Sequence, residues 1–215
     1  MAAKRKKKTV HLKFGEAIEI EDLKTLASRL HMARLSGPVV QRRPGTREGD
    51  ILGFVKGLRL SAQLVYFIRK RMSHTELEVS WGHLLDKNRA SCSPECDIIL
   101  HKKGYVDKWN GSDHPIMDFR FVHASEARAV VSCKSELGRI DAKYPAGLKK
   151  YGIKKVLLFA ECCPFRRFDT LRKQAKAAGY AGLWCLYLTK ADKTQIQIDD
   201  KIHVSFVKVL KSIAA

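Results

Sequence analysis

Two short segments carry most of the information about the fold. Residues 93–100 read SPECDIIL, and residues 130–137 read VVSCKSEL. Each segment contains an apolar run, which is typical of a buried strand, and a charged side chain next to or within that run. The charged residue is Asp97 in the first segment and Lys134 in the second. A charged group at the end of a buried strand is costly to desolvate without a partner. We therefore predict that Asp97 and Lys134 face one another at a functional site.

The rest of the chain alternates between strand-like and helix-like patterns. Short apolar or alternating runs predict strands at residues 76–81, 96–101, 116–122, 127–133, 155–160 and 183–188. Amphipathic periodicity predicts helices at residues 18–34, 50–72, 138–151, 165–178 and 199–213. This order predicts an α/β fold in which a central mixed β-sheet is flanked by helices on both faces.

Composition divides the 215 residues into three parts. Residues 1–17 form a basic N-terminal tail, residues 18–49 a small helical extension and linker, and residues 50–215 the main globular domain. Neither of the glycine-rich motifs that cradle phosphates occurs, so no nucleotide cofactor is expected.

The charge predicts a polyanionic partner. The chain has 41 Lys and Arg against 22 Asp and Glu, a formal net charge of +19. Such an excess favours binding to nucleic acid, with a strong dependence on salt, over a generally basic soluble protein. Basic residues concentrate after Lys134, and we predict that the nucleic-acid contacts include Arg139, Lys143, Arg166, Arg167 and Lys173.

The cysteines and the N-terminus predict a cytoplasmic protein. The six cysteines lack the paired spacing of a zinc site, and the N-terminus is charged rather than apolar. A reducing compartment without disulfides is therefore expected. No apolar run approaches the length of a membrane span.

Phosphodiester hydrolysis accounts for the Asp97–Lys134 pair. A divalent ion, Mg²⁺ or Mn²⁺, offsets the charge of the phosphate and takes oxygen ligands, which Asp97 and the backbone carbonyl of Cys133 could supply. Lys134 could orient or deprotonate the attacking water, or stabilise the charged transition state. The alternative is a purely structural ion pair.

Together, the two segments resemble the PD-(D/E)XK nuclease superfamily. The resemblance covers about residues 50–190 and implies a restriction-endonuclease-like fold with an Mg²⁺-dependent site that cuts DNA. Restriction-modification and other defence nucleases are common members of the superfamily. Such enzymes often act as homodimers, because cutting two strands needs two sites, so a homodimer is expected.

The sequence departs from this family pattern at two positions. Ser132 stands two residues before the lysine, where an acidic residue is usual, and Gln63 occupies the face of the leading helix that often carries Glu. Glu136 is the predicted replacement among the metal ligands, and the other acidic candidates are Glu95, Asp141 and Glu161. A catalytically impaired nuclease-fold protein that binds DNA or another subunit is the first rival hypothesis. A basic RNA-binding protein is the second.

Overall fold

The computed structural model describes seven stretches of the chain: residues 14–35, 48–72, 75–88, 91–103, 106–107, 119–190 and 195–215. For residues 14–18, 48–56, 106–107 and 119, only the backbone is described. The first 13 residues of the predicted basic tail and the loop part of the predicted linker, residues 36–47, lie outside these stretches, as do residues 116–118 of one predicted strand.

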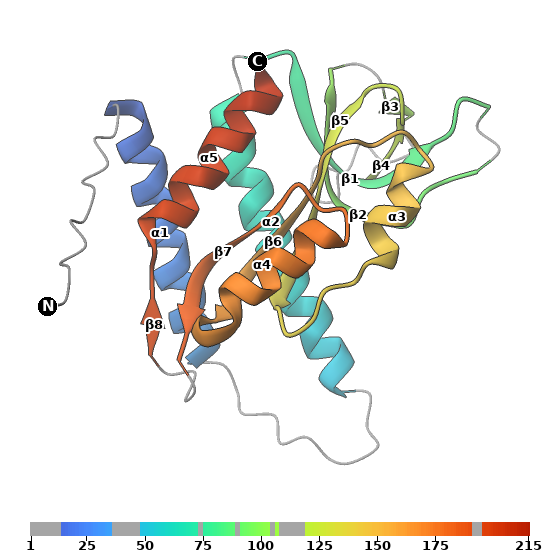
Figure 1. Cartoon of the computed structure of the whole chain (residues 1–215). Helices are drawn as coiled ribbons and strands as arrows, with labels where there is room; N and C mark the ends of the chain where they lie inside the picture. Colours follow the sequence, from blue (N-terminus) through green and yellow to red (C-terminus); the bar gives the residue numbers. More distant parts are fainter. Residues whose placement is uncertain are drawn as a thin grey trace, which may run out of the picture.

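Eight strands of the described residues form one mixed sheet in the order β3-β4-β1-β2-β5-β6-β7-β8 (Figure 1). β1 pairs antiparallel with β2, and β2 pairs antiparallel with β5, whereas β5, β6 and β7 run parallel. The strands are β1 (Leu77–Leu85), β2 (Cys96–Lys102), β3 (Val106–Asp107), β4 (Phe119–His123), β5 (Ala127–Glu136), β6 (Val156–Pro164), β7 (Gly182–Thr189) and β8 (Ile196–Gln197). The central strands are buried over most of their length because helices cover both of their faces.

Three helices cover one face of the sheet and two cover the other. The first group is α1 (Phe14–Leu35), α2 (Glu48–Met72) and α5 (Asp200–Ala214), and the second is α3 (Lys143–Lys149) and α4 (Phe168–Ala177). Phe206 of α5 packs on Phe159 of β6 with ring centroids 4.5 Å apart. Since α3 and α4 each connect parallel neighbours in the same direction, right-handed crossovers place both on the opposite face. The predicted fold class is thereby confirmed.

The N-terminal helix belongs to the same hydrophobic core as the sheet. Leu23, Leu26 and Leu30 of α1 are buried in one cluster with Leu60 and Leu64 of α2 and with the central strands. The helix within the predicted small extension, residues 18–49, therefore packs directly on the main domain.

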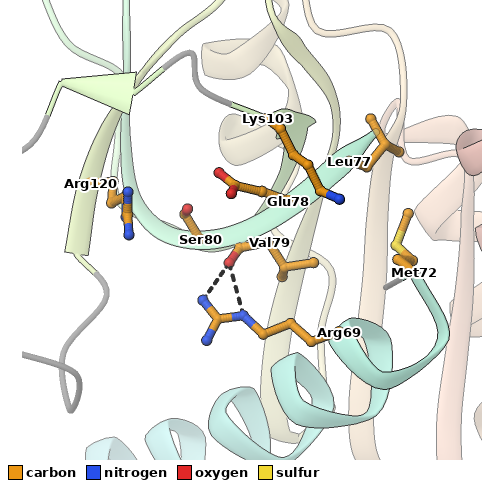
Figure 2. Close-up of a pocket in the computed structure, with 8 residues that line it drawn as sticks. All are labelled: Arg69, Met72, Leu77, Glu78, Val79, Ser80, Lys103 and Arg120. Atoms are coloured by element: carbon orange, nitrogen blue, oxygen red, sulfur yellow. Dashed lines mark hydrogen bonds between the residues drawn. The ribbon is translucent and has the colours of Figure 1, made fainter. Parts of the chain in front are cut away.

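A sharp bend in β1 lets this strand pair with two partners. Its first half pairs with β2 and its second half with β4, and the register shifts between Ser80 and Gly82. Gly82 has φ of 145°, and a Cβ at this position would collide with the carbonyl oxygen of Arg120. From α2, the Arg69 guanidinium donates hydrogen bonds of 3.3 and 2.7 Å to the Val79 carbonyl just before the bend (Figure 2). The positive φ of Gly82 and its close contact with the Arg120 carbonyl of β4 together require glycine at this position.

Within the described residues, we find no helix whose length and apolar character would let it cross a bilayer. All six cysteines are free, and only Cys92 is exposed.

Candidate active site

Asp97 is joined directly to the strand that carries Lys134. The backbone N–H of Cys133 donates a hydrogen bond of 2.8 Å to Oδ2 of Asp97. The antiparallel register pairs Ile98 with Val131, so Asp97 lies where β2 begins and β5 ends. The structure therefore brings the two segments 93–100 and 130–137 together at one edge of the sheet.

The backbone of β5 presents a second oxygen toward Asp97. In an extended strand the N–H and C=O of one residue point to the same side. On the other side of β5, the Val130 N–H donates to Lys155 O at the start of β6. The N–H of Cys133 instead points to Asp97, and its carbonyl points the same way. Its buried thiol lies within reach of the Ser61 side chain of α2.

Burial raises the pKa of Asp97 above its ordinary value of 3.8. The Cys133 N–H, the Lys134 ammonium and the Ser132 hydroxyl act in the opposite direction, and the nearby Glu95 carboxylate raises the pKa further. Because the raising effects prevail, the carboxylate at this position is held at a net cost. Such a cost is typical of functional sites, where a cation or a substrate offsets it.

Two tyrosines place the site on the face of the sheet that α3 and α4 cover. Tyr144 of α3 donates from its hydroxyl to Glu95 O at 3.2 Å, and Tyr180, just before β7, donates to Asp141 O at 3.0 Å. Burial raises the pKa of both phenols, and the charge of Asp97 raises it further. Asp97 therefore lies among hydroxyl groups that stay protonated at neutral pH.

The other acidic candidates all have partners. Glu136 accepts a hydrogen bond of 2.6 Å from Arg34, and Glu95 accepts one of 2.7 Å from Trp81. Asp141 accepts from the backbone N–H of Lys143 at 2.9 Å. Glu161 is fully buried on β6. For Glu136, Glu95 and Asp141, the hydrogen bond named here engages one of the two carboxylate oxygens, so these contacts alone do not exclude a metal role.

Gln63 lies half-buried on α2, the helix next to the thiol of Cys133. Among the hydrogen bonds of the described residues, none connects Gln63 to Asp97 or to Lys134. The structure therefore gives Gln63 no direct link to the pair. Lys134 itself is exposed, while Ser132 is buried.

The oxygens at this edge suit a hard cation such as Mg²⁺. Over the residues that the structure describes, no group of three or more His, Cys, Asp or Glu side chains could hold a metal ion. Mg²⁺ does not need such a group, because it keeps several waters and binds through one or two carboxylates together with substrate phosphates. Asp97 and the Cys133 carbonyl meet that smaller requirement.

The predicted nucleic-acid contacts lie in the segments that follow the site. Arg139 follows β5, Lys143 begins α3, and Lys173 lies on α4. Arg166 and Arg167 form part of a single 3₁₀ turn, η1 (Phe165–Arg167), which leads into α4. All five side chains are exposed. They therefore belong to the connections on the α3 and α4 face of the sheet.

Sequence reasoning missed a buried charge cluster near the same edge. Glu161 accepts a hydrogen bond of 2.7 Å from the Tyr187 hydroxyl and forms ion pairs with Arg59 of α2 at 3.4 Å and Arg34 of α1 at 3.7 Å. Arg34 also pairs with Glu136. The one signal in the sequence was a glutamate inside an otherwise apolar strand, since such a charge is buried only with partners.

A pocket of about 290 Å³ beside β1 is separate from this edge. Its lining includes Arg69, Ser80, Lys103 and Arg120, with neither Asp97 nor Lys134 (Figure 2).

The sheet order and the helices on both faces define a restriction-endonuclease-like fold. Solved structures of NucC are similar to this chain. NucC from P. aeruginosa ATCC27853 in its cAAA-bound form matches with a TM-score of 0.59 and 10% identity, over 95% of this chain and 92% of that chain. NucC from E. coli MS115-1, also cAAA-bound, matches with a TM-score of 0.59 and 11% identity, over 96% and 92%.

At this level of identity the likeness shows the fold alone. It carries no information on Ser132. No protein-family model and no curated protein matches the sequence.

Proposed function

We propose that this chain is a metal-dependent DNA endonuclease that hydrolyses phosphodiester bonds at the edge shared by Asp97 and Lys134. The hydrogen bond from Cys133 N to Asp97 Oδ2 is the observation that carries the proposal. It joins the aspartate of one strand to the residue that precedes the lysine of the next. A DNA role is supported by the net charge of +19 and by the exposed basic residues that follow the site.

Asp97 and the Cys133 carbonyl are the proposed ligands for Mg²⁺ or Mn²⁺. When bound there, the ion would offset the charge of the phosphate and lower the pKa of a bound water. Asp97 can serve with one oxygen while the other keeps the hydrogen bond from Cys133 N. Glu136 is a further candidate ligand, and its binding to the ion would have to accommodate Arg34, which donates to its Oε2 at 2.6 Å.

Lys134 is the proposed catalytic cation. Its exposed ammonium can donate to the attacking water or to a phosphate oxygen on which charge develops. Ser132, in the usual place of an acidic residue, keeps a hydroxyl beside the Asp97 carboxylate, where it favours the charged form. Ser132 is therefore a positioning residue in this proposal. A homodimer would supply the two sites that double-strand cleavage requires.

The test is the nicking of supercoiled plasmid with Mg²⁺ or Mn²⁺, beside an Asp97→Ala protein and a sample with chelator. We expect nicking that requires the ion and is lost in the variant. Equal nicking by the variant would overturn the assignment of the site. A structured RNA cut faster than the plasmid would overturn DNA as the substrate.

A second candidate is a nuclease-fold protein that binds DNA without cutting it. Ser132 favours this candidate, together with the ion pair that engages Glu136. Tight, salt-sensitive binding of DNA with no nicking under any metal would establish it.

A further inference from the structure

A second concave surface lies at the end of the sheet where β5 and β6 begin. It is a hollow of about 800 Å³ formed by three segments, which are the chain after β1, the turn between β4 and β5, and the loop from α3 to β6, together with Ile213 near the end of α5. We call this hollow the basic groove, because five of the side chains that line it are cations: Lys87, Arg128, Lys150, Lys154 and Lys155.

The basic groove is far more positive than the chain as a whole. It has five cations and one carboxylate, Asp86, whereas the whole chain has 41 Lys and Arg against 22 Asp and Glu. All five cationic side chains are exposed. Among the described residues, no ion pair involves any of them. The local excess of positive charge is therefore available to a ligand.

The character of the groove indicates an extended polyanion rather than a small molecule. Sites for small ligands are mostly apolar and converge a few fixed polar groups on one point. Here the charges sit on long exposed side chains from three separate segments, as in contacts to a nucleic-acid backbone. Tyr151, which also lines the groove, uses its hydroxyl in a bond of 3.3 Å to Ser91.

The groove lies in line with the candidate active site. Arg128 and Lys134 are on the same strand, six residues apart, which corresponds to about 20 Å. Helix α3 leads back from the end of β5 to the groove (Figure 1). Lys143, one of the predicted nucleic-acid contacts, begins this helix, and the exposed Lys150 of the groove directly follows it. A span of 20 Å covers about six base pairs of duplex DNA at 3.4 Å each.

We propose that the basic groove binds the phosphate backbone of the same DNA duplex that enters the Asp97–Lys134 site, about six base pairs from the cut. The choice of DNA rests on the proposed function, while the groove itself rests on the residues named above. Its role would be to hold the duplex in register, because phosphate contacts position the DNA and carry no sequence information.

The test compares two variants with the same change in net charge. Lys150→Glu/Lys154→Glu alters the groove, and Lys201→Glu/Lys208→Glu alters two exposed lysines of α5 that do not line it. Affinity for a 24-base-pair duplex is measured against salt concentration, and thermal melting checks that both variants fold. Each lost phosphate contact lowers the slope of log affinity against log salt by about 0.9.

We expect the slope to fall by about 2 in the groove variant and to stay unchanged in the α5 variant. Equal slopes in wild type and groove variant, equal losses in both variants, or no binding of DNA by the wild type would each overturn the proposal. A further contrary result would be that micromolar ATP displaces DNA from the wild type but not from the groove variant. That result would overturn the proposal, because it would show that the groove is a site for a small nucleotide. Because binding is measured without cleavage, a protein that shows the expected slopes but never nicks DNA refutes the proposed hydrolysis and supports the groove.

Discussion

The backbone N–H of Cys133 donates a hydrogen bond to Asp97 across the gap between two strands, at 2.8 Å. This bond holds a carboxylate in a half-buried position, where burial raises its pKa. The same bond aligns the Cys133 carbonyl with the carboxylate. Burial therefore accounts for the cost of the site to the fold, and the hydrogen bond, which partly offsets that cost, places two oxygens where a cation could bind.

The Asp97→Asn protein should be more stable than the wild type at neutral pH. Asparagine keeps an oxygen for the Cys133 N–H and removes a charge that the folded state holds at a cost. Because the folded pKa is raised, the contribution of Asp97 to stability is complete below about pH 3.8 and is lost as pH rises through the folded pKa. The melting temperature of the variant should therefore exceed that of the wild type at pH 7, and the gain should shrink toward pH 3.

The control is Asp169→Asn, which removes one negative charge from an exposed position, measured over the same pH range. If Asp97→Asn melts at a lower temperature than the wild type at pH 7, the prediction is contradicted. The favourable interactions of the charged carboxylate would then outweigh the cost of burying it.

Binding of Mn²⁺ should depend on Asp97 more than on Glu136. Calorimetry should show that Asp97→Asn weakens Mn²⁺ binding by at least about tenfold, an effect seen even for groups that only support a ligand. Glu136→Gln should change it less, because Arg34 already engages Glu136. Affinity for the wild type should also fall as pH falls toward the raised pKa of Asp97, since a ligand must be deprotonated. If Asp97→Asn binds Mn²⁺ as tightly as the wild type does, Asp97 is not a ligand of the ion.

The buried cluster at Glu161 should contribute strongly to stability. Glu161→Gln leaves two guanidiniums without their shared carboxylate, and we expect a loss of about 3 kcal/mol in the free energy of unfolding. For a chain of this size that is a fall of roughly 10 °C in melting temperature. The matched change is Glu136→Gln, which removes the more exposed carboxylate from the same Arg34 and should cost less than about 1 kcal/mol. Similar losses in the two proteins would show that burial of Glu161 adds nothing.

The bend in β1 should depend on glycine at position 82. Gly82→Ala combines a strained φ with a collision against the Arg120 carbonyl, so a loss of at least about 2 kcal/mol is expected. Gly57→Ala in α2 has open space around the new Cβ and should instead stabilise the protein by about 0.5–1 kcal/mol. Chemical denaturation of both variants measures the contrast, and a Gly82→Ala protein as stable as the wild type would refute the close approach.

The sequence was sufficient to predict the central elements of the fold. The apolar runs at 96–101 and 127–133 correspond to β2 and β5, and the run at 183–188 corresponds to β7. These strands are buried on both faces, so their composition is set by the core and can be recognised locally. The same runs placed Asp97 and Lys134 on strands that prove to be neighbours in the sheet.

What the sequence did not predict depends on contacts between distant residues. β3 and β8 have two residues each, too few for any periodic pattern. The division of β1 between two partners depends on Gly82 and on the carbonyl of Arg120, which lie far apart in the chain. Arg34 reaches Glu136 across 102 positions, so no local spacing could indicate that this candidate ligand already has a partner.

The rate of plasmid nicking by single and double variants tests the assignment of Asp97 and Lys134 most directly. If both residues serve one chemical step, Asp97→Ala and Lys134→Ala should each slow Mg²⁺-dependent nicking by about 100-fold or more, and the double variant should be hardly slower than either. Nicking by Asp97→Ala or by Lys134→Ala at the wild-type rate would contradict a shared active site at this edge of the sheet.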